Sequence, residues 1–136
     1  MSRRLARETA LQVLYQIDLT GETENVASAI ENWANEFAVS AKNLPFLKQL
    51  VIGTLENIEV IDDKIKLFAH DWSIDRMSVV DRNLMRLAVY EMLFCPDIPQ
   101  KVTVNEASDI AKKFGSDDSS KFINGILDKI MAVTEK

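Results

Sequence analysis

The sequence has little of what metal proteins and many enzymes are built from. Among 136 residues there is one cysteine, Cys95, and one histidine, His70. A disulfide needs two cysteines and a zinc site needs three or four ligands, so we expect no internal disulfide and no His/Cys metal site. Cys95 follows Leu93 and Phe94, which favours a packed, reduced thiol. His70 is interpreted as a helix-end residue, where a cation suits the helix dipole.

Glycines are also few and scattered. Gly21, Gly53, Gly115 and Gly125 form no Gly-rich loop that could cradle a phosphate. The paired acids at 62–63 and 117–118 are explained more simply by a solvated helix face and by a helix N-terminus. We therefore expect a protein that is not an enzyme and has no catalytic residues, metal or cofactor.

Long apolar runs are missing as well. No run approaches the roughly 20 residues that a membrane-spanning helix needs, and the opening MSRRL lacks the apolar stretch of a secretory signal. We expect a cytoplasmic protein without membrane association. The length fits one domain, residues 1–136.

The charge is acidic overall but unevenly distributed. A net charge of −5 taken alone argues against nucleic acid as a partner. However, Arg3, Arg4 and Arg7 come before any acidic residue. From there to Lys42, every charged residue is acidic. This asymmetry predicts a small basic end on an acidic body.

Apolar residues recur at spacings of three and four along almost the whole chain, which is the pattern of amphipathic helices. No strand pattern of comparable length competes, so the prediction is an all-α fold of about seven helices. Four are expected at about 3–19, 25–39, 43–57 and 59–70, and three more begin after residues 78, 103 and 116. The connection at 71–77, which contains Trp72, divides the chain into halves of about 1–71 and 72–136.

Several of these helices begin at residues that can cap an N-terminus. Ser78 with Asp81, and Thr103 with Glu106, have the spacing of a capping box. The other expected N-caps are Asn43, followed by Pro45 in the first turn, and Ser116. Gly115 is expected to end the sixth helix in the left-handed conformation.

The first helix has two distinct faces at about 100° per residue. Its burying face comprises Ala6, Ala10, Val13, Leu14 and Ile17, and a separate stripe comprises Arg4, Arg7, Leu11 and Tyr15. Guanidinium groups bind phosphates and a tyrosine ring can stack on an unpaired base, so this stripe has the chemistry of a single-stranded RNA site. Alternatively, the arginines are solubilising and Tyr15 packs between helices, and spacing alone favours this second interpretation.

The last helix poses a similar choice. Ile123, Ile126, Leu127 and Ile130 form its core stripe, Phe122 lies at the edge of that stripe, and Lys121 lies on the outer side. Phe122 is either a core residue or a stacking platform, and the core is favoured because an aromatic beside an apolar stripe usually packs.

Four sequence blocks resemble the NusB family. They are RRLARETALQVLYQ at 3–16, DRNLMRLAVYEML at 81–93, DIP with VTVNEA at 97–107, and AKKFGSDDSSKFINGILD at 111–128. The likeness covers the whole length, and the last block is the most specific.

This resemblance implies a fold of two small packed helical bundles and a role in transcription antitermination. The implied partners are boxA RNA, bound as a heterodimer with NusE, the small-subunit ribosomal protein, and, through the assembled complex, RNA polymerase and other Nus factors. The implied outcome is suppression of early termination during ribosomal RNA transcription.

The resemblance also implies site residues, by matching position. For RNA these are Arg3, Arg4, Arg7, Gln12 and Tyr15 on the first helix and Asp118, Lys121 and Phe122 on the last. Asp81, and with it Asp75, is expected to face NusE. Leu5 stands where some members have another arginine, so we expect modest RNA affinity that NusE strengthens. Asp118 either contacts RNA or only caps its helix.

Two other interpretations compete. The same helical fold resembles the N-terminal module of some ribosomal RNA cytosine-5 methyltransferases, but the sequence has no cofactor-binding loop or catalytic domain. A non-catalytic helical adaptor that binds only protein partners fits the acidic charge equally well. The sequence leaves open whether the free protein is a monomer or a homodimer, because apolar stripes look alike within and between chains.

Overall fold

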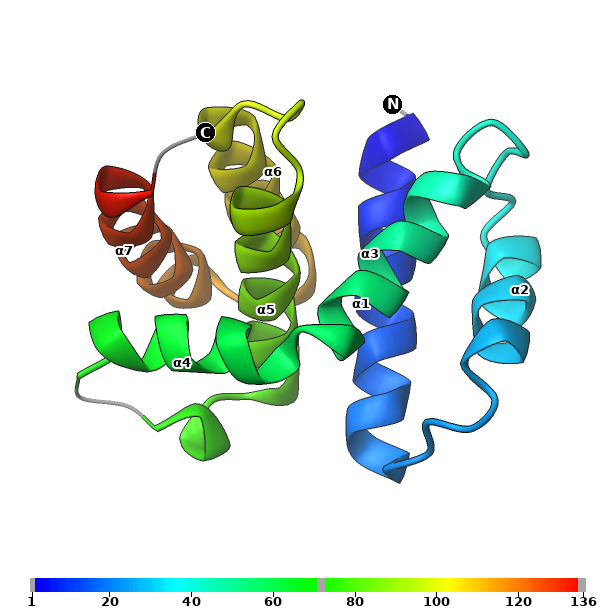
Figure 1. The fold of residues 1–136 in the computed structure, drawn as a ribbon, viewed down its shortest axis with the longest axis horizontal. Coiled ribbons are helices and arrows are strands. Elements are labelled where there is room, and N and C mark those ends of the chain that lie inside the picture. The colour runs from blue at the N-terminus through cyan, green and yellow to red at the C-terminus, as the bar shows by residue number, and fades with distance from the viewer. Residues whose placement is uncertain (1, 71–72, 135–136) are drawn as a thin grey trace.

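The computed structural model describes residues 2–70 and 73–134, and within them every regular element is helical (Figure 1). The α-helices are α1 (Ser2–Thr20), α2 (Val26–Glu36), α3 (Leu44–Glu56), α4 (Ile58–Phe68), α5 (Val79–Phe94), α6 (Gln100–Phe114) and α7 (Asp117–Val133). A short 3-10 turn, η1 (Ile74–Arg76), precedes α5. The predicted all-α class and the seven helices are confirmed, while Trp72 lies outside the described residues.

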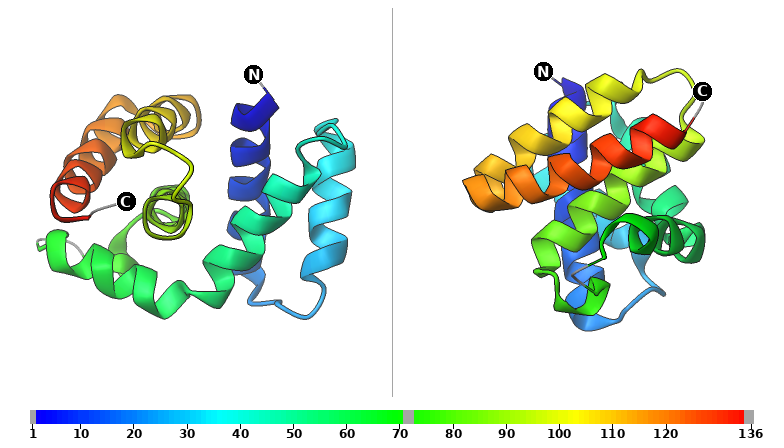
Figure 2. Two further views of the ribbon diagram at one scale, coloured as in Figure 1. Left: turned by 45° about the horizontal axis from the view of Figure 1, so that its top comes forward. Right: turned by 90° about the vertical axis from the view of Figure 1, so that its left-hand side faces the viewer.

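The helices form two small bundles that share one interface. One bundle consists of α1, α2 and α3, and the other of α4, α5, α6 and α7, with α5 packed against both α1 and α3 (Figures 1 and 2). The position of α4 differs from the division that we expected from the sequence. This helix belongs to the half before residue 71 in sequence, but it packs on α5 and α7 more than on α3.

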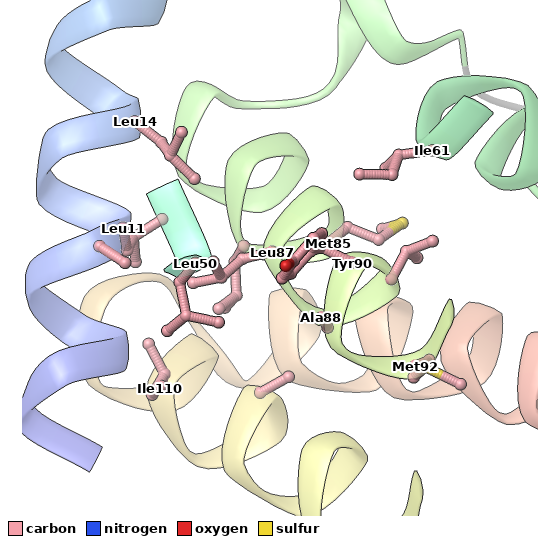
Figure 3. Packing of buried hydrophobic residues seen from close by; sticks show 14 of the residues in the cluster. Leu11, Leu14, Leu50, Ile61, Met85, Leu87, Ala88, Tyr90, Met92 and Ile110 are labelled. Carbon is pink, nitrogen blue, oxygen red and sulfur yellow. The ribbon is translucent and has the colours of Figure 1, made fainter. Parts of the chain in front are cut away.

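A continuous apolar core runs through both bundles. Leu11, Leu50, Leu87 and Tyr90 meet where α1, α3 and α5 converge (Figure 3). Leu11, which the sequence placed on a stripe separate from the burying face of α1, therefore belongs to the core and is only 4% exposed. Cys95 is also buried, as expected. Among the described residues, none of the helices is both long and apolar enough to cross a bilayer.

Two of the predicted caps are confirmed. The Ser78 hydroxyl accepts a hydrogen bond from the backbone N–H of Asp81 at 3.0 Å, and that of Ser116 accepts one from Ser119 at 3.0 Å. These caps fix the starts of α5 and α7.

Three local predictions are wrong. Thr103 does not begin a helix, because α6 already starts at Gln100 and the buried Thr103 lies in its second turn. Gly115 ends α6 with a negative φ of −121° rather than in the left-handed conformation. Asn43 precedes α3 as expected, but its amide donates to the Ser40 hydroxyl instead of capping the helix.

An ion-pair network ties the two bundles together. Asp18 at the end of α1 accepts hydrogen bonds from Arg82 at 2.6 and 2.7 Å and from the Asn83 amide at 2.7 Å. Arg86, one turn further along α5, binds Asp62 of α4 at 2.8 and 3.0 Å. Burial acts to raise the pKa of Asp18, but the hydrogen bonds from Arg82 and Asn83 outweigh it and hold the pKa below its usual value.

Candidate nucleic-acid interface

Arg3 lies in the first turn of α1. Its side chain is exposed, and its guanidinium carbon lies 4.3 Å from the centroid of the Phe46 ring on α3. A cation over an aromatic face keeps its charge accessible to solvent on the other side. Arg3 is therefore available to an approaching phosphate.

Arg4 is already engaged by acids of α6. Its Nε donates to Glu106 at 2.7 Å, and its Nη2 donates to Asp109 at 2.9 Å. The hydrogen bond from Arg4 lowers the pKa of Glu106 below its usual value, although burial opposes the shift. Both groups of this pair are therefore charged at neutral pH.

Arg7 is buried, with 4% of its surface exposed. Its Nε and Nη2 form a two-pronged ion pair with Glu91 of α5 at 2.8 and 2.9 Å, and its Nη1 lies 3.3 Å from Glu106. The Thr103 hydroxyl donates to the same Glu91 carboxylate at 3.0 Å. The expectation that Arg7 lies on an exposed stripe is therefore wrong, because a partner 84 residues away in sequence holds it inside the protein.

Gln12 and Tyr15 lie further along α1, beside the end of α6. They line a shallow pocket, here called the aromatic pocket, together with Glu8, Leu11, Val80 and Phe114. Phe114 is 47% exposed. Next to it, Lys113 binds Glu8 at 2.9 Å and lies 5.3 Å from the Phe114 ring centroid. Two aromatic rings thus line the same hollow, and a lysine that is paired with Glu8 lies beside one of them.

The sequence did not single out Phe114 and Lys113 as candidates for this surface. The signal was present as an aromatic residue directly after two lysines and before Gly115. An apolar residue in the last turn of a helix has no helical neighbours on one side, so it is often left exposed.

The α7 candidates divide between two hollows. Asp118 and Phe122 line a pocket, here called the α7 pocket, together with Arg76, Met77, Ser78, Asp81, Ser116 and Ser119. Phe122 is half-buried against the core, and the rest of its surface lines this pocket. Lys121 is exposed and lines a separate polar groove between α6 and α7, which also holds Lys112 and Asn124.

The first turn of α5 joins the aromatic pocket to the α7 pocket. Val80 lines the former and Asp81 lines the latter. The Asp81 carboxylate accepts a hydrogen bond from Ser119 of α7 at 3.1 Å, while its other oxygen is buried without a hydrogen-bond partner. Asp81, expected to face a protein partner, therefore lies in the same hollow as Asp118 and Phe122, and Asp75 lies exposed in η1 nearby in sequence.

This surface has the groups that bind a strand of nucleic acid, but few of its positive charges are free of acidic partners. Aromatic rings supply stacking, and Arg3, Lys113 and Lys121 supply cations for phosphates. Within the described part of the chain, no group of three or more His, Cys, Asp or Glu residues is arranged to hold a metal ion.

Sequence comparison places relatives along the whole chain. The model of the NusB family matches residues 4–132. A transcription antitermination protein NusB from Desulfitobacterium hafniense is 57% identical over 136 residues, covering all of this chain and 92% of the relative. The corresponding protein of Desulforamulus reducens is 53% identical and covers 96% of this chain and 90% of its own length.

Solved structures agree in fold. The NusB of T. maritima superposes with a TM-score of 0.90 at 39% identity, covering 98% of this chain and 93% of that one. A NusB crystallised with NusE and double-stranded RNA gives a TM-score of 0.87 at 32% identity, covering 96% of each chain.

Proposed function

Because this chain belongs to the NusB family, we propose that it is a transcription antitermination factor that binds RNA and a NusE protein. The RNA is boxA, bound by the heterodimer of this chain with NusE during ribosomal RNA transcription. RNA polymerase and other Nus factors join through that assembly, and the protein works in the cytoplasm without catalysing a reaction.

The observation that carries the RNA role is the aromatic pocket. Tyr15 and the exposed ring of Phe114 flank a hollow beside Lys113, with Gln12 at its edge. Stacking of a base on an aromatic ring is worth about 1–3 kcal/mol and works without duplex structure. An unpaired base that stacks on Phe114 would cover the exposed part of its ring, which lies beside a cation.

The α7 pocket supports a second contact. Phe122 and Asp118 extend the RNA surface, and Lys121 adds a cation on the outer side of α7. Asp75 and Asp81 would face NusE from η1 and α5. In this arrangement RNA and protein meet at the first turn of α5, which explains why NusE would strengthen RNA binding.

One observation favours the protein-only adaptor instead. Arg4 and Arg7, the basic residues that first pointed to RNA, are paired with Glu91, Glu106 and Asp109. An adaptor would use these pairs for folding alone and would have no affinity for RNA.

Fluorescence anisotropy of labelled boxA RNA, with a scrambled RNA for comparison, separates the two. We expect salt-sensitive binding of boxA that tightens when NusE is added. Phe114→Ala should weaken binding about 5- to 100-fold through lost stacking. The matched control is Leu67→Ala, which removes an apolar side chain of α4 that is 61% exposed, against 47% for Phe114.

No preference for boxA over the scrambled RNA, with or without NusE, would contradict the proposed boxA function, and the absence of binding to either RNA would favour the adaptor. Equal losses for Phe114→Ala and Leu67→Ala would remove the aromatic pocket from the RNA surface while leaving RNA binding in place.

A further inference from the structure

Arg4 and Arg7 are bound by more negative charge than they carry themselves. Arg4 and Arg7 contribute two positive charges, and the carboxylates of Glu91, Glu106 and Asp109 that bind them contribute three negative ones. An RNA phosphate arriving at Arg4 therefore meets a cluster whose charges sum to −1 rather than +2.

The cluster has an inner pair, Arg7 with Glu91, and an outer pair, Arg4 with Asp109. The two pairs differ in how readily the arginine can exchange its partner. The Arg7 and Glu91 side chains are 5% and 2% exposed, so this pair is held by burial. The side chains of Arg4 and Asp109 are 32% and 55% exposed. Exposed ion pairs contribute little net stability, because water and salt screen them. Arg4 can thus leave Asp109 at small cost, whereas Arg7 cannot leave Glu91.

The geometry of the outer pair matches that of a phosphate contact. Glu106 binds the Nε and Nη2 edge of Arg4 in two-pronged fashion, at 2.7 and 2.5 Å, and Asp109 shares Nη2 at 2.9 Å. That edge is also the one with which guanidinium groups bind phosphate oxygens in two-pronged fashion. A carboxylate and a phosphate therefore compete for the same donors.

We propose that Glu106 and Asp109 form an autoinhibitory contact that competes with RNA phosphates for Arg4 and so limits the RNA affinity of the free protein. This inference rests on the proposed RNA-binding function. When RNA binds, Arg4 turns from Glu106 and Asp109 to a phosphate. Glu106 keeps its contact with Arg7, and the exposed Asp109 carboxylate returns to water.

The test is RNA affinity and its salt dependence in Asp109→Asn. Removing the carboxylate charge should lower the Kd by about two- to fivefold, the range typical of an exposed ion pair. If Arg4 then neutralises one more phosphate, the slope of log K against log salt should steepen by about 0.7 for single-stranded RNA. Glu106→Gln should act in the same direction, with thermal unfolding checked because Glu106 also faces Arg7.

Two controls separate this contact from a general change in charge. Asp63→Asn removes the same charge from the exposed face of α4, at the opposite edge of the molecule from the start of α1 (Figure 1). In an Arg4→Gln background, Asp109→Asn should no longer raise the affinity, because the competed-for group is gone.

The outcomes are distinct. Wild-type binding with equal effects of Asp109→Asn and Asp63→Asn, or an effect that persists without Arg4, would overturn the autoinhibitory contact and leave the proposed function intact. Absence of RNA binding in every variant would overturn both.

Discussion

At the scale of single residues, Gly53 decides how closely α3 can approach α5. A Cβ atom placed on Gly53 would overlap the ring of Tyr90. That ring is confined, because it is 6% exposed and stacks on Phe94 with centroids 5.5 Å apart. The absence of a side chain at Gly53 therefore sets the spacing of the two helices that join the bundles.

We expect Gly53→Ala to destabilise the protein by about 1–3 kcal/mol through overpacking. Gly125→Ala is the matched control, since Gly125 lies in α7 with open space around it and alanine favours a helix by up to about 1 kcal/mol. Urea denaturation measures both changes. A stability of Gly53→Ala equal to or above that of the wild type would mean that the α3–α5 contact adjusts freely.

Residue roles were the least predictable part of the site. The sequence named Arg3 and Arg7 together as RNA candidates. It could not show that Glu91 would bury Arg7 and leave Arg3 exposed, because Arg7 and Glu91 are 84 positions apart. Helical spacing also placed Leu11 beside Arg4, and only the approach of α3 and α5 explains its burial. A helical wheel shows which residues share a face of one helix. How many of those faces are buried depends on the neighbouring helices in the fold.

At the scale of elements, α1 is attached to α5 and α6 through the buried Arg7 and Glu91 pair. Thr103 of α6 completes this contact by donating to Glu91. This role explains why the predicted cap at Thr103 is wrong, since its hydroxyl serves another helix and α6 begins a turn earlier. In contrast, the caps at Ser78 and Ser116 involve only neighbouring residues, and these were predictable.

Removing one member of this buried pair should be costly. Glu91→Ala leaves the Arg7 charge inside the protein with only Glu106 nearby, and we expect a loss of about 3–5 kcal/mol. The double variant Arg7→Met with Glu91→Leu should recover much of that loss, because two apolar side chains need no partner. Thermal unfolding of the three proteins tests this, and equal stability of Glu91→Ala and the wild type would contradict a fold-supporting pair.

The structural role of Arg7 limits its use in mapping an RNA-binding surface by mutation. A loss of binding after Arg7→Ala would not distinguish a missing phosphate contact from a displaced α1. Variants of Arg3 and Phe114 avoid that ambiguity, because both side chains are exposed.

At the scale of the whole molecule, Asp18 is the centre of the network that joins the bundles. The sequence predicted the helices and the presence of two bundles. It grouped α4 with the first three helices, whereas α4 packs mainly on α5 and α7. No periodicity distinguishes an apolar face that packs on the preceding helix from one that packs on a later helix. The network of Asp18 with Arg82, and of Asp62 with Arg86, was equally invisible before the fold.

The lowered pKa of Asp18 predicts acid sensitivity. Because the folded-state pKa lies below the usual value of 3.8, ionised Asp18 stabilises the folded protein. That contribution is complete above the usual pKa and is lost as the pH falls through the lower folded-state value. Asp18→Asn should therefore lower the Tm at neutral pH, and its difference from the wild type should shrink on acidification. A difference that is constant across this pH range would contradict the assignment.

The contact between Trp33 and Gln16 has a practical consequence. The indole N–H of α2 donates to the Gln16 side chain of α1 at 2.7 Å, so its surroundings change when these helices separate. With Trp72, the only other tryptophan, replaced by phenylalanine, intrinsic fluorescence would report on the N-terminal bundle alone. Circular dichroism averages over every helix, whereas that emission is a local probe of unfolding in one half of the protein.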